Sequence, residues 1–155
     1  MNLYLAQFKR GYAYTSVYLL RDRTDEDGNQ SFGFYRADYS PRKAAIYLHN
    51  LMTILADNGT LAKPGHLDFA IANQPETVHE LLLQHSEGTF QLIVWDERLR
   101  GQHRVTVQLG VTPASVRIYD PTIGIEPVRT PTNVSSFELG LSDHPIVIAI
   151  SSSRQ

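Results

Sequence analysis

Three consecutive stretches decide which fold is expected of this chain: Tyr14-Thr-Ser-Val-Tyr-Leu-Leu20, Arg21-Asp-Arg-Thr-Asp-Glu-Asp-Gly-Asn-Gln30 and Ser31-Phe-Gly-Phe-Tyr-Arg36. The first is apolar and rich in β-branched and aromatic residues, which predicts a strand over 14–20. The second is an acidic loop, and the third is a shorter β-like piece. Ser40 as a capping residue and Pro41 as a first helical residue then predict the start of a helix. The expected order is therefore strand, polar loop, helix.

Two helices are expected, one before the strand and one after the polar loop. In residues 41–57 the apolar side chains recur every three to four positions and form one stripe, with Asp57-Asn58-Gly59 as the stop: Ala44, Leu48, Leu51, Met52 and Leu55. Residues 2–10 are also helical in pattern and end at Lys9-Arg10-Gly11. Because about nine residues make only a marginal isolated helix, this one is expected to be the tail of a longer helix.

After about residue 60 the pattern changes to short β-branched or aromatic-rich runs separated by turn residues. Alternation is clearest in Val105-Thr-Val-Gln-Leu109. The expected strands are Leu67–Ile71, Thr77–Gln84, Thr89–Trp95, Arg104–Leu109, Val116–Tyr119, Ser136–Leu141 and Ile146–Ile150. Roughly seven strands at this spacing predict an antiparallel β-sandwich. The chain is therefore expected to be mainly β, with an N-terminal segment over 1–58 and the sandwich over 59–151.

Composition excludes several classes of function. The 155 residues carry a formal net charge of −2, so the basic field that nucleic-acid binding requires is missing. No apolar run reaches the roughly 20 residues that a membrane-spanning helix needs, and no signal-peptide pattern opens the chain. We expect a soluble protein, which would be secreted if a longer parent carries an export signal. Zero cysteines exclude disulfides, thiolate metal sites and a cysteine nucleophile in this chain.

Strand, polar loop and helix together form the repeating unit of a β/α barrel, in which the loops after strands carry function. Phe32–Leu55, which spans the last part of this unit, resembles the closing unit of clan A glycoside hydrolases. Phe90–Asp96, Val116–Pro121 and Leu141–Ile148 resemble, in this order, the C-terminal β-sandwich that packs on such a barrel. The likeness is closest to bacterial proteins related to the β-xylosidase and α-L-iduronidase family. Residues 1–58 are then a remnant of the (β/α)8 barrel.

The resemblance implies that this chain lacks its own catalytic residues. In that family the acid/base glutamate follows the fourth barrel strand and the nucleophile follows the seventh, and both positions fall before Met1. A retaining glycosidase needs two carboxyl groups about 5–5.5 Å apart, and we assign no such pair. The expected function is that of a C-terminal glycoside hydrolase fragment, non-catalytic by itself, whose sandwich supports the barrel. Its expected partners are a carbohydrate, through the parent enzyme, and the missing barrel domain.

The acidic loop supplies the candidate binding residues. Barrels place active-site loops after their strands, so Asp22 and Asp25 are candidates for hydrogen bonds to sugar hydroxyls at the rim of a cleft. Tyr18 either lines that cleft or fills the contact between the two parts of the chain. The alternative is a solvated turn built around Asp27-Gly28.

No metal or cofactor is expected. Counting from Asp25, Gly28 is fourth and Arg36 twelfth, whereas a calcium-binding EF-hand loop needs glycine sixth and glutamate twelfth. The six histidines show no zinc spacing such as His-Glu-x-x-His.

Two other classes of function stay open. A free-standing carbohydrate-binding module predicts a row of exposed aromatic residues on one sandwich face. A protein-interaction module that docks onto a separately encoded barrel predicts an exposed apolar surface around Leu48, Leu51 and Leu55. Trp95, the only tryptophan, is expected in the core or in an interdomain contact rather than in a sugar platform.

Overall fold

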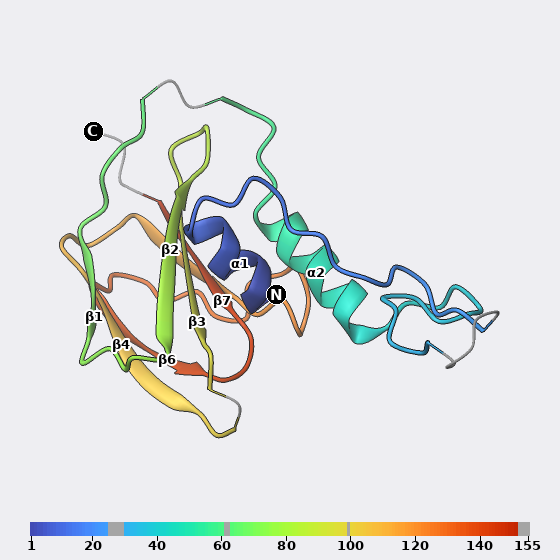
Figure 1. The fold of residues 1–155 in the computed structure, drawn as a ribbon. Coiled ribbons are helices and arrows are strands. Elements are labelled where there is room, and N and C mark those ends of the chain that lie inside the picture. The colour runs from blue at the N-terminus through green and yellow to red at the C-terminus, as the bar shows by residue number, and fades with distance from the viewer. Residues whose placement is uncertain (25–29, 61–62, 99, 152–155) are drawn as a thin grey trace.

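The computed structural model describes residues 1–24, 30–60, 63–98 and 100–151. Seven strands form two antiparallel sheets beside two short helices (Figure 1). The three-stranded sheet has the order β1-β4-β6 and the four-stranded sheet β2-β3-β7-β5. Their bounds are β1 Phe69–Ala72, β2 Val78–Gln84, β3 Phe90–Asp96, β4 His103–Leu109, β5 Ser115–Tyr119, β6 Ser136–Leu141 and β7 Ile146–Ser151. The prediction of a mainly β chain with an antiparallel, sandwich-like pair of sheets is confirmed.

The core between the sheets is built from alternating side chains. Along β4, Val105, Val107 and Leu109 are buried, while the alternating residues Arg104, Thr106 and Gln108 are not, as expected for a strand with one face toward a core. Residues of both sheets form this core, mainly Leu92, Val94, Val107, Val116, Phe137, Leu141, Ile148 and Ile150. Burial of this apolar surface is the main force that holds the sheets together.

The strand β3 is buried on both faces, because the outer face of the four-stranded sheet is covered as well. All seven residues of β3 are buried. Ile93 and Trp95 lie in a second hydrophobic cluster with Leu5 and Leu51 from the two helices, and with Val147 of β7. Trp95 is therefore a core residue where helices and sheet meet, as expected.

The helix α1 (Asn2–Lys9) lies on this outer face. It is tied to the sandwich by Asn2, whose Nδ2 donates to the carbonyl oxygens of Asp96 (3.1 Å) and Asp143 (3.2 Å). At its other end, Lys9 Nζ pairs with Glu80 Oε1 of β2 at 2.8 Å. The boundary at residue 58 stays a prediction, but α1 and the sandwich share one hydrophobic cluster.

The helix α2 (Lys43–Ile54) reaches the sandwich only with its C-terminal half, and its N-terminal end projects away (Figure 1). It begins two residues later than Pro41, and Ser40 does not cap it. Instead the Ser40 hydroxyl donates to Asp38 Oδ1 at 2.7 Å. The predicted cap is wrong because this hydroxyl is held by its own turn.

The predicted strand over 14–20 is wrong: the structure forms no strand there. Phe34 and Tyr35 donate backbone hydrogen bonds to Leu19 and Leu20, and isolated bridges follow at Arg21 and Arg23. A strand exists only where a neighbouring strand satisfies its backbone groups, and the short 31–36 piece offers too few partners. The barrel remnant stays a prediction. Among the described residues, no helix has the length and apolar character to cross a membrane.

Candidate functional site

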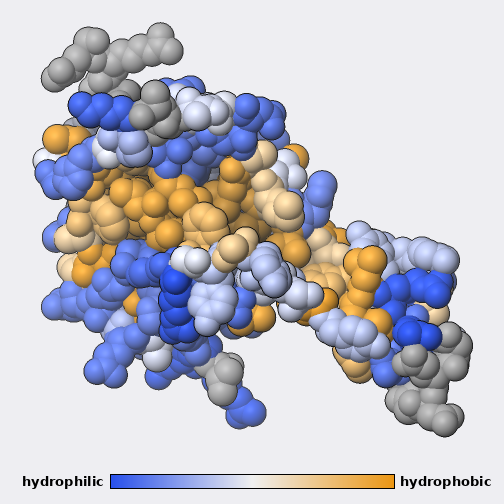
Figure 2. All heavy atoms as spheres, turned by 45° about the horizontal axis from the view of Figure 1, so that its top comes forward, coloured by the Kyte–Doolittle hydropathy of each residue, from blue (hydrophilic) through white to orange (hydrophobic). Residues whose placement is uncertain are grey.

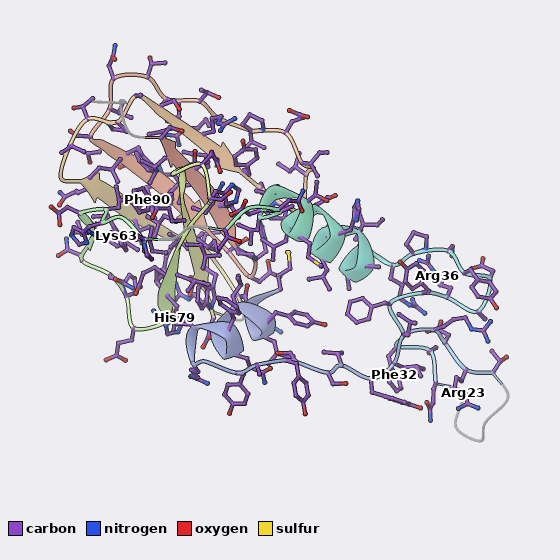
Figure 3. The ribbon with its side chains drawn as sticks, turned by 90° about the horizontal axis from the view of Figure 1, so that it is seen from above. Arg23, Phe32, Arg36, Lys63, His79 and Phe90 are labelled. Atoms are coloured by element: carbon purple, nitrogen blue, oxygen red, sulfur yellow. The ribbon has the colours of Figure 1, made fainter. Side chains whose placement is uncertain are left out.

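Residues 17–24 and 30–42, the described parts of the acidic loop and its flanks, form a projection that we call the lobe (Figure 1). Figure 3 shows Arg23, Phe32 and Arg36 together on the lobe, well apart from Lys63 and Phe90 on the sandwich. Isolated bridges between Arg21 and Tyr35, and between Arg23 and Gln30, hold its chain segments side by side. Few backbone pairs and no large core define the lobe, so side-chain contacts must shape it.

Asp22 is the polar centre of the lobe. It is only 7% exposed, and its Oδ1 accepts a hydrogen bond from the Gly33 N–H at 2.8 Å. Its Oδ2 pairs with Arg42 Nη2, which also donates to the Ser31 carbonyl at 3.0 Å. Buried charges need such partners. Both carboxylate oxygens of Asp22 therefore hold the lobe together and are turned away from solvent.

Gly33 allows this close approach. A Cβ added at this glycine would lie 2.7 Å from the Arg21 carbonyl carbon and 2.7 Å from the Asp22 nitrogen. Side chains do not tolerate such distances from backbone atoms, so only glycine fits between the two segments.

Tyr18 points outward, in contrast to Asp22. Its side chain is 64% exposed, beside Phe32 at 61%, and the two ring centroids are 6.3 Å apart with tilted planes. The Tyr18 hydroxyl donates to Gln30 Oε1 at 3.0 Å. Two exposed rings beside an amide form a surface that is suited to apolar and hydrogen-bonding contacts at once. Asp25, the third predicted rim residue, lies outside the described residues.

The base of the lobe carries further local contacts. The Arg21 guanidinium lies 4.7 Å from the centroid of the exposed Tyr39 ring, within cation–π range. Hydrogen bonds from the Ser40 hydroxyl and the Ser40 backbone N–H lower the pKa of Asp38. The turn before α2 is therefore built by Asp38 and Ser40.

Three hollows flank the two helices. One of about 450 Å³ is lined by apolar side chains of α1, α2 and β2 and by residues 12–15. A second of about 540 Å³ reaches Thr122, Asp143 and His144, and a third of about 290 Å³ lies toward Leu20 and Tyr35. Tyr4 and Leu48 border all three. The helices are thus well supported on one side only.

The second hollow contains a histidine between two carboxylates. His144 Nε2 lies 3.2 Å from Asp120 Oδ2, and its Nδ1 lies 3.0 Å from Ser142 Oγ and 3.3 Å from Asp143 Oδ1. Asp120 is held in turn by the Thr122 N–H and hydroxyl. Sequence reasoning saw only a turn at Asp143-His-Pro145, because the Asp120 partner is distant in the chain. The contacts link two turns, and this linkage is their evident role.

Exposed hydrophobic residues are unevenly distributed. Among the residues that the structure describes, twelve of the sixteen exposed large hydrophobic side chains lie in residues 1–58, and Tyr14 reaches 84%. Figure 2 shows hydrophobic surface that is broad on the body of the molecule and continues toward the lobe. Monomeric proteins rarely leave such patches uncovered unless they bind something.

No protein-family description and no curated protein matches the chain. Within the described ranges, no group of three or more histidine and acidic side chains is placed to hold a metal ion.

Proposed function

We propose that this chain is the non-catalytic C-terminal part of a glycoside hydrolase related to the β-xylosidase and α-L-iduronidase family. In this proposal residues 1–58 complete a barrel, and the sandwich supports that barrel. The observation that carries the proposal is the concentration of exposed apolar side chains in residues 1–58. The ordered resemblance of four sequence phrases names the family.

The exposed side chains lie where a barrel surface would cover them. Tyr14 is exposed on the segment that leads into the lobe, and Val17 and Leu20 are exposed at the start of the lobe. In a barrel, neighbouring strands and helices cover such a segment on both sides. The unformed strand over 14–20 fits the same proposal, because its hydrogen-bonding partners would belong to the barrel.

The internal contacts of Asp22 give the lobe its role in the proposal. Asp22 ties residues 31–33 to Arg42 just before α2. We infer that this contact holds the loop at the cleft, while the exposed Tyr18 and the half-buried Gln30 meet the carbohydrate. Asp25 stays a candidate for the same contact.

A free-standing carbohydrate-binding module receives less support. That function needs exposed aromatic rings on a sandwich face, but within the described part of residues 59–151 the exposed large hydrophobic residues are Val111, Ile123, Ile125 and Val128. The exposed rings lie instead on the N-terminal segment and the lobe.

The proposal is tested with the purified chain and a truncated barrel. We expect residues 1–155 alone to leave aryl β-xylosides and β-glucosides unhydrolysed. We expect the chain to bind, and restore hydrolysis to, a β-xylosidase-like barrel from which the last strand–helix unit and the sandwich are deleted. Turnover by the chain alone would contradict the proposal, and so would a failure to bind the barrel.

A double variant sharpens the test. Tyr14→Lys with Leu20→Lys places two charges in the proposed contact and should abolish binding. Ile123→Lys, at an equally exposed apolar position on the sandwich, should leave binding intact. Equal loss in both variants would contradict a contact through residues 1–58.

A further inference from the structure

The strand β2 is an edge strand, and its outward side is open. Thr77 O accepts from Glu97 N, and His85 N donates to Thr89 O, so the odd-numbered residues between them turn their backbone groups toward β3. The even-numbered residues then face outward, as Val78 O does when it accepts from Gln74 Nε2 at 2.8 Å. Among the described residues, no backbone group meets the outward N–H and C=O of Glu80 and Leu82.

The other sheet edges are protected. Beside β5, Ile118 exchanges backbone hydrogen bonds with Val128 and Arg129. Beside β6, Arg129 Nη1 donates to the Glu138 carbonyl at 3.0 Å, and β1 has only four residues. By contrast, β2 has seven residues and contains neither proline nor lysine. Proline and lysine are residues that normally prevent edge-to-edge pairing. At the start of β2, Gln74 donates to the Val78 carbonyl and Lys9 pairs with the Glu80 side chain. The part of the β2 edge without such partners begins there.

We infer that this edge pairs with β2 of a second copy of the chain, antiparallel and with Leu82 on the twofold axis. In this register Leu82 faces Leu82, Leu81 faces Leu83, and Glu80 faces Gln84 of the second copy. No like charges oppose each other, which matters because opposed like charges destabilise a strand pair. The hydrogen-bonding positions of the two strands also match in this register. Residues 80, 82 and 84, whose backbone groups face outward, meet one another as hydrogen-bonded pairs.

The side chains beside the edge favour the same partner. Leu81 and Leu83 are half-buried and line the 450 Å³ hollow, while Leu82 packs at the rim of the sandwich core. A second copy would cover all three leucines with its own. A twofold interface repeats each contact, so one self-complementary strand suffices. This inference concerns the sandwich and does not depend on the proposed glycosidase role.

Sedimentation of the full chain over a concentration series tests the pairing. We expect a reversible monomer–dimer equilibrium that Leu83→Lys weakens about tenfold or more, because each dimer then holds two lysine charges, each facing Leu81 of the other copy. The control Ile123→Lys should leave the equilibrium unchanged. A chain that stays monomeric throughout, or a dimer that tolerates Leu83→Lys, would overturn the inference.

Cross-linking tests the register, since the chain has no cysteine of its own. Leu81 and Leu83 would form a non-hydrogen-bonded pair about 4.5 Å apart between Cα atoms, within disulfide range. Leu81→Cys with Leu83→Cys should therefore give a disulfide-linked dimer far faster than Ile123→Cys. Equal rates would overturn the register.

Hydrogen exchange on the unaltered chain covers the case in which a variant fails to fold. The Leu82 amide should exchange more slowly in concentrated than in dilute solution. Fast exchange at both concentrations would overturn the pairing.

Discussion

Asp96 is the most deeply buried charge in the described chain, and it holds the end of β3. Its Oδ2 lies 2.8 Å from His103 Nδ1, while Arg98 Nη1 lies 2.9 Å from His103 Nε2. Arginine can only donate, so Nε2 accepts and Nδ1 carries the hydrogen donated to Asp96. Burial raises the pKa of Asp96, but hydrogen bonds from Thr77, His103 and the Arg98 N–H outweigh it, and the pKa lies below its usual value.

Asp96→Asn should lower the free energy of unfolding by about 2 kcal/mol at neutral pH, since hydrogen bonds to a buried charge are lost. A lowered pKa in the folded state means that this stability is present above the unfolded value of about 3.9 and is lost as pH falls through the folded pKa. The difference between wild type and variant should therefore shrink in acid. Urea unfolding at pH 7, 5 and 3 measures it.

Glu126→Gln, at an exposed position, is the control for this titration and should unfold like the wild type at all three pH values. A constant difference between wild type and Asp96→Asn across the series would contradict the assigned role of the carboxylate.

Single residues show where sequence reasoning succeeds and where it stops. Trp95 was expected in the core or in an interdomain contact because Leu92 and Val94 lie just before it in the sequence, and it is buried. Asp22 was expected at a rim, but whether a carboxylate faces solvent depends on distant partners. Nothing in the loop sequence indicates that Gly33 and Arg42 meet it. Tyr18 is exposed as a rim residue must be, but its contact with carbohydrate stays a prediction.

At the scale of elements, neighbouring residues of α2 differ widely in burial. Leu51 is 3% exposed, whereas the next residue, Met52, is 65% exposed. Leu51 lies in the cluster with Trp95 and Val147. The stripe predicted from the spacing is real, but the sandwich covers only part of it.

Leu51→Ala should therefore cost about 3 kcal/mol, the usual size for a buried leucine. Met52→Ala, one position further along, should change stability by less than about 0.5 kcal/mol. Thermal or urea unfolding of both variants measures the contrast. Similar losses would mean that α2 is buried on a different face.

The seven strands expected after residue 60 are all found, each within two residues of its predicted ends. Alternating apolar residues and clear turns carry that information locally. The run over 14–20 has the same composition and forms no strand, because pairing is a property of two segments and not of one. Composition therefore predicts the capacity to form a strand, and the fold decides whether it is used.

At the scale of the whole molecule, a well-packed sandwich is joined to an N-terminal segment with many exposed apolar side chains. The sandwich buries a large shared core. The N-terminal segment leaves Phe8, Tyr14 and Leu20 exposed. The sequence predicted the sandwich, but not that α1 would rest on the outer face of the four-stranded sheet, since no local pattern specifies which face a helix covers.

The exposed segment should bind a hydrophobic dye. Tyr14→Lys with Leu20→Lys should lower the fluorescence of such a dye on the folded chain, with the unfolding free energy changed by less than about 0.5 kcal/mol per site. Ile123→Lys should lower the signal less, because that residue belongs to no comparable cluster. A dye signal that neither variant changes would place the binding surface elsewhere.

Because Trp95 is the only tryptophan and lies between β3 and the two helices, the protein carries a built-in optical probe of one contact. Indole emission shifts to longer wavelength when water reaches the ring. Detachment of α1 or α2 would shift the emission maximum to longer wavelength even if the strands stayed intact. A difference between the fluorescence and far-ultraviolet dichroism transitions would then reveal whether the helices leave before the sandwich unfolds.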